Sequence, residues 1–118
     1  MRSKKIILRG QSACGGTAEG TVRIISGDVL NDEMLVKDLE KVKEGDILVT
    51  TMTRPLFVMV MRKVKAIVTD KGGVLCHAAM VSREFGIPCV VGTKAGTKIL
   101  KDGQRVLVNA NEGLIYEI

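Results

Sequence analysis

The sequence has few aromatic residues: among its 118 residues only Phe57, Phe85 and Tyr116 are aromatic, and tryptophan is absent. Proteins that bind single-stranded nucleic acid stack bases on aromatic rings, so this chain has almost no material for such a surface. The net charge is +5, and the basic excess lies in residues 60–118, with nine basic against five acidic residues. An excess of this size is more often a solvated surface than a binding site, although it suits an anionic partner. We therefore expect no nucleic-acid partner.

Paired cysteines and long apolar runs are also missing. Cys14, Cys76 and Cys89 form no C-x-x-C pair, so neither a disulfide framework nor a zinc site that includes His77 has the usual ligand spacing. The apolar run that begins at Ile6 is too short for an export signal or a membrane span. We expect a cytoplasmic protein with no metal ligands of its own and no membrane association.

Length and composition allow a folded core. A chain of 118 residues with 46% hydrophobic and 26% charged residues is typical of one compact domain, which we take to span residues 1–118. Apolar periodicity and turn residues predict strands at Lys5–Arg9, Thr21–Ile25, Ile47–Thr50, Ala66–Thr69, Cys89–Val91, Arg105–Asn109 and Leu114–Ile118. They predict helices over Glu33–Val42, after a turn at Thr53–Pro55, and over His77–Phe85. This alternation is typical of an α/β domain.

A glycine-rich stretch separates the first two expected strands, from Gly10 to Gly20. Its Gly10-x-x-x-x-Gly15 spacing is that of a phosphate-binding P-loop, but Gly16 and Thr17 stand where that motif requires Lys and then Ser or Thr. We interpret the stretch as a loop of tight turns without a nucleotide site.

The only histidine, His77, opens a predicted helix just after Gly72 and Gly73. Backbone N–H groups at a helix start favour a dianionic group, and a neutral imidazole can attack phosphorus through one ring nitrogen. Ala78 and Ala79 are expected to leave this helix end open, and Arg83 is expected to neutralise charge. The residues alone leave the alternative open that His77 is an ordinary hydrogen-bonded structural residue.

Two long motifs carry a family resemblance: residues 69–79 read TDKGGVLCHAA, and residues 82–93 read SREFGIPCVVGT. They resemble the phosphohistidine swivelling domain of the phosphoenolpyruvate (PEP)-utilising enzymes, and the Cys-His-Ala-Ala run is most similar to that of the PEP synthases. Further matches in the same order are Gly45–Val49, Thr53-x-Pro55, Lys101–Gly103 and Gly113-x-x-Tyr116, so the resemblance extends almost from end to end.

The resemblance implies a single β/β/α swivelling domain in which His77 accepts a phosphoryl group and passes it on. The surrounding motif would support the phosphate loop through Gly72, Gly73, Thr69, Asp70, Cys76, Ala78 and Arg83. Turn chemistry is an alternative role for Thr69 and Asp70, and an internal salt bridge is one for Arg83. Leu75 replaces a threonine that some relatives phosphorylate for regulation, so that regulation should be absent.

The resemblance also implies partners, because a globule of this size cannot itself hold the other sites of a complete PEP synthase. ATP, magnesium and PEP are expected at the sites of a nucleotide-grasp protein and a PEP/pyruvate-binding barrel protein that act in trans. The sequence thus indicates a freestanding phosphoryl carrier. The alternative is a non-catalytic interaction or regulatory module that keeps the fold without phosphotransfer.

Overall fold

The computed structural model describes residues 5–26 and 31–118. These residues form an eight-stranded sheet with the order β1-β8-β7-β3-β4-β5-β6-β2. The three strand pairs between β3 and β6 are parallel, and the remaining pairs are antiparallel. The strands are β1 Lys5–Arg9, β2 Gln11–Cys14, β3 Thr17–Ile25, β4 Ile47–Thr50, β5 Ala66–Thr69, β6 Cys89–Val91, β7 Arg105–Asn109 and β8 Leu114–Glu117.

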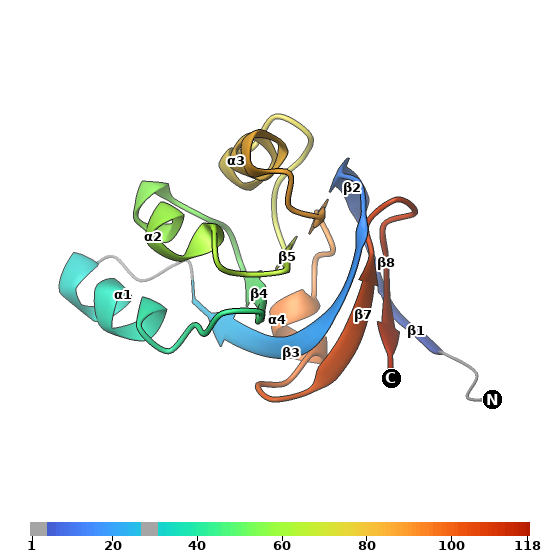
Figure 1. Cartoon of the computed structure of the whole chain (residues 1–118), viewed down its shortest axis with the longest axis horizontal. Coiled ribbons are helices and arrows are strands. Elements are labelled where there is room, and N and C mark those ends of the chain that lie inside the picture. Colours follow the sequence, from blue (N-terminus) through green and yellow to red (C-terminus); the bar gives the residue numbers. More distant parts are fainter. Residues whose placement is uncertain (1–4, 27–30) are drawn as a thin grey trace.

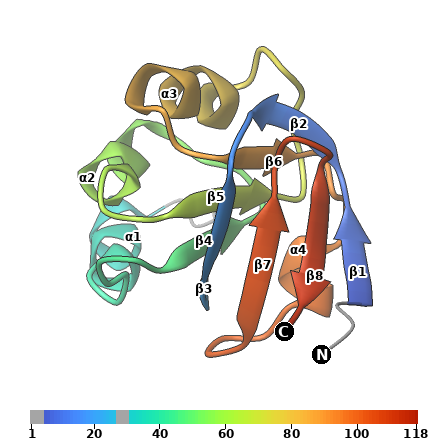
Figure 2. The same cartoon turned by 45° about the vertical axis from the view of Figure 1, so that its right-hand side comes forward.

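The central parallel strands are buried on both faces, which is why their sequences are continuous apolar runs instead of alternating ones. Successive side chains of β4 point to opposite sides: Leu48 joins a core cluster under the helices, whereas Ile47 and Val49 join a second cluster against β7 and β8. The molecule therefore has three layers, with helices, parallel strands and antiparallel strands in turn (Figures 1 and 2).

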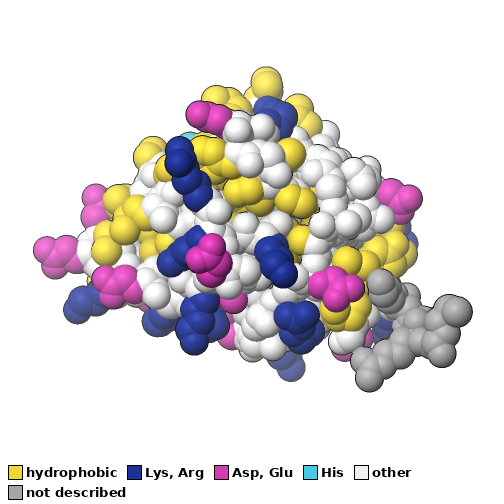
Figure 3. Space-filling view, in the orientation of Figure 1, with side chains coloured by type: hydrophobic (Ala, Val, Ile, Leu, Met, Phe, Trp, Pro, Cys, Tyr) yellow, Lys and Arg dark blue, Asp and Glu magenta, His cyan; other side chains and the backbone are white. Residues whose placement is uncertain are grey.

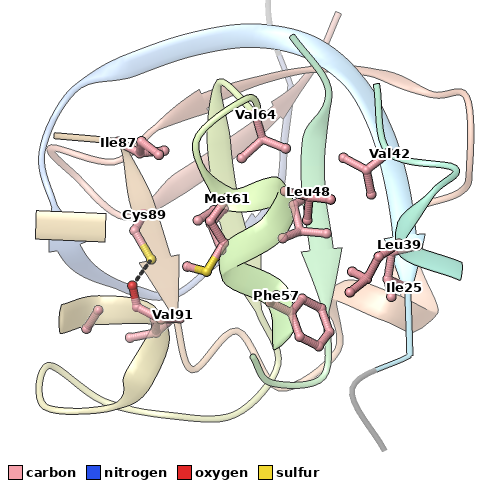
Figure 4. Close-up of a cluster of buried hydrophobic side chains, with 14 of the residues drawn as sticks. Ile25, Leu39, Val42, Leu48, Phe57, Met61, Val64, Ile87, Cys89 and Val91 are labelled. Carbon is pink, nitrogen blue, oxygen red and sulfur yellow. Dashed lines mark hydrogen bonds between the residues drawn. The ribbon is translucent and has the colours of Figure 1, made fainter. Parts of the chain in front are cut away.

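The helical layer consists of α1 Asp32–Leu39, the 3-10 turn η1 Pro55–Phe57, α2 Val58–Met61 and α3 His77–Phe85. These elements bury Leu39, Phe57 and Met61 against the parallel strands, as the close-up in Figure 4 shows. A short helix, α4 Gly96–Ile99, covers part of the other face near β1, β4 and β5. No helix in residues 5–26 and 31–118 is long and apolar enough to cross a membrane.

Gly10 connects the two strands at the opposite ends of the sheet order, β1 and β2. Its N–H donates to the Gly113 carbonyl at 2.8 Å, and a Cβ atom at this position would lie 2.7 Å from the Val91 carbonyl oxygen. The chain therefore turns from the antiparallel layer to the parallel layer at a point with no room for a side chain.

The glycine-rich stretch is where the sequence prediction was wrong. It was expected to be a loop, but it contains β2 and the first half of β3, which pair with β6 and β7. Only Gly10 and the residues around Gly16, whose φ is +123°, interrupt the strands. Non-local strand pairing outweighs the low strand preference of glycine here, because the antiparallel neighbours satisfy the backbone hydrogen bonds.

Smaller differences concern element ends. Helix α1 ends at Leu39, three residues before the expected Val42, and Met34 of its expected apolar face is exposed. Strand β8 ends at Glu117, and α4 was not predicted at all because four residues carry too little periodicity. The expected α/β class and the other central strands are confirmed.

Candidate functional site

His77 is the first residue of α3, and α3 is the helix at the top of the molecule in Figure 1. Its ring is partly exposed, and its Nδ1 atom forms a 2.7 Å hydrogen bond with the Oγ1 atom of Thr53. Thr53 is only 6% exposed and precedes η1, so a buried hydroxyl fixes the orientation of the ring. For the Nε2 atom, no hydrogen bond is recorded within the part of the chain that the structure describes. The Nδ1 atom is thus hydrogen-bonded within the fold, and the Nε2 atom is available to bind or react with a ligand.

A pocket of about 210 Å³ lies beside this histidine. Most of its lining is apolar or uncharged, no carboxylate contributes, and Lys71 is the only residue with a permanent positive charge: the lining residues are Met52, Thr53, Thr69, Lys71, Gly72, Cys76, His77 and Ala78. No group of three or more His, Cys, Asp or Glu side chains in residues 5–26 and 31–118 could hold a metal ion. The surroundings of His77 are therefore suited to an anion and offer no ligand set for a hard cation.

The start of α3 carries unused hydrogen-bond donors. Cys76 is the N-cap residue, with φ −72° and ψ 167°, and its side chain makes no capping hydrogen bond. The first intrahelical bond runs from the Met80 N–H to the Cys76 carbonyl at 3.0 Å, so the N–H groups of residues 77–79 have no acceptor inside the helix. The first turn contains no acidic residue. This end of α3 therefore presents a partial positive charge beside the His77 ring.

The loop before α3 is fixed by a glycine and by the strand ends. Gly72 has a φ of +109°, a region that favours glycine, and a Cβ atom here would lie 2.8 Å from the Cys76 sulfur. Gly73 has no positive φ, and a Cβ atom at this position would lie 3.8 Å from Gln11 Oε1, an ordinary contact distance. Of the two glycines expected in the loop, Gly72 is thus the one that the backbone requires.

Thr69 and Asp70 connect the loop to its neighbours. The Thr69 hydroxyl donates to the Lys71 carbonyl at 2.6 Å, closing a turn at the end of β5. The Asp70 carboxylate accepts hydrogen bonds from the N–H and hydroxyl of Thr97 at 2.9 and 2.5 Å, which links the loop to α4. Both side chains therefore hold the loop in place, and Thr69 also lines the pocket beside His77.

Arg83, which the sequence predicts to support the phosphate loop, contacts two backbone carbonyls. Its guanidinium donates to the carbonyl of Ala13 at 3.1 Å and to the carbonyl of Val74 at 2.6 Å. It therefore joins α3 to β2 and to the loop. The ion pairs of residues 5–26 and 31–118 do not include Arg83, so the alternative of a salt bridge within the chain is not seen there. The sequence could not show this because both acceptors are backbone carbonyls, and that of Ala13 lies 70 residues away.

The expectation for Ala78 and Ala79 also needs correction. Their side chains are 2% and 0% exposed and belong to the core cluster under the helices. They are small because α3 packs closely on β2, β5 and β6, and they do not open the helix end to solvent. Only Ala78 also contributes to the pocket wall.

Burial shifts the titration of His77. Partial removal of the ring from water lowers the pKa of His77 below its ordinary value of 6.5, because desolvation disfavours the charged imidazolium. The ring is therefore largely neutral at pH 7, which is the form that carries a nucleophilic lone pair. Burial also raises the pKa of the Cys89 thiol to about 12, so that thiol is protonated in the core.

Exposed apolar side chains lie on the loop before α3 and on the first turn of that helix. Leu75 is 80% exposed, Met80 is 56% exposed and Val74 is 42% exposed. Figure 3 shows hydrophobic side chains gathered over α3 and the loop before it, with the histidine visible at their edge. Leu75 occupies the position of the regulatory threonine named in the sequence analysis, and its apolar side chain faces solvent. We call Val74, Leu75 and Met80 the apolar rim.

Sequence reasoning missed Thr53 as a site residue. The Thr53-x-Pro55 pattern was recognised only as a family match and a turn, and 24 residues separate Thr53 from His77. The available signal was a hydroxyl residue at the end of one parallel strand and the histidine loop after the next, since these strand ends share one edge of the sheet.

A family model described as "PEP-utilising enzyme, mobile domain" matches residues 42–113, which include Thr53, the loop and α3. The chain belongs to this family. The family expected from the sequence is thereby confirmed.

This chain is similar in sequence to one segment of several PEP synthases. It is 52% identical over 113 residues to a probable phosphoenolpyruvate synthase of Archaeoglobus fulgidus and 50% identical over 113 residues to the phosphoenolpyruvate synthase of Pyrococcus furiosus, covering 96% of this chain in both cases. A probable phosphoenolpyruvate synthase of Methanothermobacter thermautotrophicus is 47% identical over 99% of this chain. The chain spans only 13–16% of the length of these relatives.

Solved structures support the fold. A structure of Enzyme I (nEIt) has a TM-score of 0.57 and 30% identity, over 65% of this chain and 32% of that one. Aconitase X of Thermococcus kodakaraensis superimposes with a TM-score of 0.68 and 24% identity over 99% of both chains. The second likeness concerns the fold alone, whereas the first also agrees with the family.

Proposed function

We propose that this mobile domain is a phosphoryl carrier related to PEP synthase, in which the Nε2 atom of His77 accepts a phosphoryl group and then releases it to a second site. The observation that supports this most strongly is that the two ring nitrogens differ: Nδ1 is hydrogen-bonded to buried Thr53, and Nε2 is left for the reaction. The ring is thus held in one orientation by a buried partner while its second nitrogen can face an incoming group.

The hydrogen bond to Thr53 sets which nitrogen reacts. A neutral imidazole has one N–H and one lone pair, so Nε2 is nucleophilic only when Nδ1 carries the proton. In that tautomer the Nδ1–H donates to Thr53 Oγ1. The Nε2 lone pair then forms the new N–P bond while the bond from phosphorus to the donor's leaving group breaks, and the Nδ1 proton stays in place on the ring.

The start of α3 stabilises the product. A phosphoryl group on His77 carries negative charge next to a helix end whose first N–H groups have no acceptor inside the helix and whose first turn has no acid. Such an end favours anions. Because Gly72 and Thr69 hold the loop in one conformation, these donors are arranged before the phosphoryl group arrives, and little ordering is needed during transfer.

The donor and acceptor sites belong to partners in this proposal. We expect ATP with magnesium on a nucleotide-grasp protein and PEP or pyruvate with magnesium on a barrel protein, because the pocket beside His77 lacks carboxylates to hold the metal. The apolar rim would be covered when a partner closes over His77 and excludes water. Strands β1 and β8 lie away from α1 and α2, on the other side of the parallel strands (Figures 1 and 2).

The test is transfer of labelled phosphate. The purified chain is incubated with a PEP synthase whose own mobile-domain histidine has been replaced, together with ³²P-labelled ATP or PEP. The expected result is label that is stable in alkali and labile in acid, located on the peptide that contains His77. The His77→Ala variant should carry none, whereas its circular dichroism spectrum should match that of the natural chain.

Two results would refute the carrier function. One is equal labelling of His77→Ala; the other is no labelling of the natural chain by a partner that phosphorylates an isolated mobile domain of its own. If His77→Ala instead binds the partner and preserves its output without any label, the chain is a binding or regulatory module. The exposed apolar rim is the observation that favours this second function.

A further inference from the structure

The pocket beside His77 has one source of permanent positive charge. A phosphoryl group on Nε2 brings up to two negative charges into a space that is lined mainly by apolar and uncharged groups. Arg83, the cation expected from the sequence, is bound to two backbone carbonyls and does not line this pocket. Lys71 does line it.

The backbone of Lys71 is fixed while its side chain is exposed. Its N–H donates to the Thr51 carbonyl at 3.0 Å, and its carbonyl accepts from the Thr69 hydroxyl at 2.6 Å. These two bonds attach Lys71 to the ends of β4 and β5, at the edge of the sheet where the histidine loop begins. The side chain starts from a defined point beside the pocket and keeps its four flexible carbons.

The Lys71 ammonium is not committed to a carboxylate. The ion pairs among residues 5–26 and 31–118 join Arg23 to Asp46, Lys41 to Asp38 and Arg54 to Asp32, and Lys71 takes part in none of them. No carboxylate lines the pocket to compete for it. A phosphoryl group on His77 would be a strong anion in the same pocket that Lys71 lines.

We infer that Lys71 is the phosphoryl-binding cation of this pocket, and that its ammonium contacts the oxygens of the phosphoryl group on His77. This inference rests on the proposed carrier function. Lys71 supplies a mobile point charge, while the N–H groups at the start of α3 supply fixed donors. The same contact lowers the barrier to accepting the group, since the ammonium neutralises the charge on the phosphoryl oxygens in the transition state.

The experiment uses phosphoramidate, a small donor that needs no partner protein. The Nε2 lone pair of His77 attacks phosphorus, the P–N bond of phosphoramidate breaks, and ammonia leaves with the nitrogen's own protons, so the Nδ1 proton remains on the ring. Phosphohistidine formation on the intact chain is followed by mass spectrometry and ³¹P NMR. After removal of the donor, the rate of phosphohistidine hydrolysis is measured.

Lys71→Met should accept the phosphoryl group about tenfold more slowly than the natural chain, the size expected for one lost charge-assisted contact. Lys71→Arg keeps the charge and should stay within about threefold. Lys98→Met removes the same charge from an exposed position on α4 and should leave both rates unchanged. The two backbone bonds of Lys71 do not depend on its side chain, and backbone NMR shifts verify that each variant is folded.

The outcomes separate the two proposals. If the natural chain is phosphorylated and Lys71→Met behaves identically in acceptance and hydrolysis, the role of Lys71 is overturned and the carrier function stands. If Lys98→Met slows acceptance as much as Lys71→Met, the effect is general steering by net charge and the assignment is again overturned. If phosphoramidate does not modify His77 in the natural chain, the carrier function itself is contradicted.

Discussion

Helices α1 and α3 lie on the same face of the sheet and have nearly equal lengths of eight and nine residues, but they begin in opposite ways. The side chain of Asn31 caps α1 by accepting hydrogen bonds from the N–H groups of Glu33 and Met34 at 2.9 and 3.2 Å, and two acidic residues follow in the first turn. Helix α3 has no capping side-chain bond and no acid there.

The difference shows at which helix start the chain itself supplies hydrogen-bond acceptors and negative charge. In α1 the sequence supplies both the hydrogen-bond acceptors and the negative charge that a helix N-terminus favours. In α3 the same needs are left unmet, at the one place where the chain has a histidine. An uncapped helix start costs stability, so its position beside His77 fits a site that a phosphoryl group completes.

The strongest way to break this contrast is to give α3 a cap like that of α1. We predict that Cys76→Asp slows phosphoryl acceptance by about tenfold, because the carboxylate repels the incoming group across a short distance. The same substitution should raise the free energy of unfolding by about 0.5–1 kcal/mol, since the extended Cys76 backbone suits an N-cap residue. Phosphoramidate labelling and urea unfolding measure the two effects.

Cys76→Asn is the matched control, because it caps the helix without adding charge. It should stabilise the fold to a similar extent and slow acceptance less than Cys76→Asp does. If the two variants accept phosphate equally fast, charge at the start of α3 does not govern the reaction. If both are less stable than the natural chain, the half-buried Cys76 side chain matters more for packing than for capping.

A milder test of the same contrast is pH. Desolvation lowers the pKa of His77, so protonation removes the reactive lone pair only at a pH below its ordinary value of 6.5. An unshifted histidine would lose about fourfold in neutral fraction between pH 8 and pH 6. We predict a smaller decrease in the acceptance rate, after correction for the ionisation of phosphoramidate itself. A loss larger than fourfold would contradict the lowered pKa.

The acidic cap should reverse this shift. A carboxylate at position 76 favours the imidazolium, so Cys76→Asp is expected to move the midpoint of His77 titration to higher pH, as measured by proton NMR of the ring. The sign for stability follows from the same shift. In the natural chain the unfolded state binds protons more readily at His77, so this residue lowers the free energy of unfolding as the pH falls below 6.5.

The sequence predicted the central strands almost to the residue, and physical reasons explain where it did not succeed. Strands β4, β5 and β6 are buried on both faces, so each is a short apolar run that has one plausible interpretation. Strand β2 contains polar and small residues, and its pairing with β6 comes from a segment more than 70 residues away. Local composition carries no record of such a partner.

The site residues also fall into two groups, those that local sequence predicts and those whose roles depend on distant partners. His77 and its helix follow from local pattern and motif, and Gly72 from the need for a turn before them. Thr53 acquires its role from the Nδ1 atom of His77, 24 residues away. Arg83 acquires its role from two backbone carbonyls, one of them 70 residues away. Their residue types were visible in the sequence, but the partners that decide between catalytic and structural roles were not.

The smallest expected effect tests the other half of the comparison, at α1. Asn31→Ala removes the acceptor for two N–H groups and should lower the free energy of unfolding by about 1 kcal/mol. Because α1 contributes Leu35 and Leu39 to the core but no residue to the His77 pocket, the rate of phosphoryl acceptance at a temperature where the variant is folded should not change. Urea unfolding and phosphoramidate labelling of the same preparation give both values. A loss of acceptance in folded Asn31→Ala would show that the two helix starts are coupled through the core, and that the end of α3 does not act on its own.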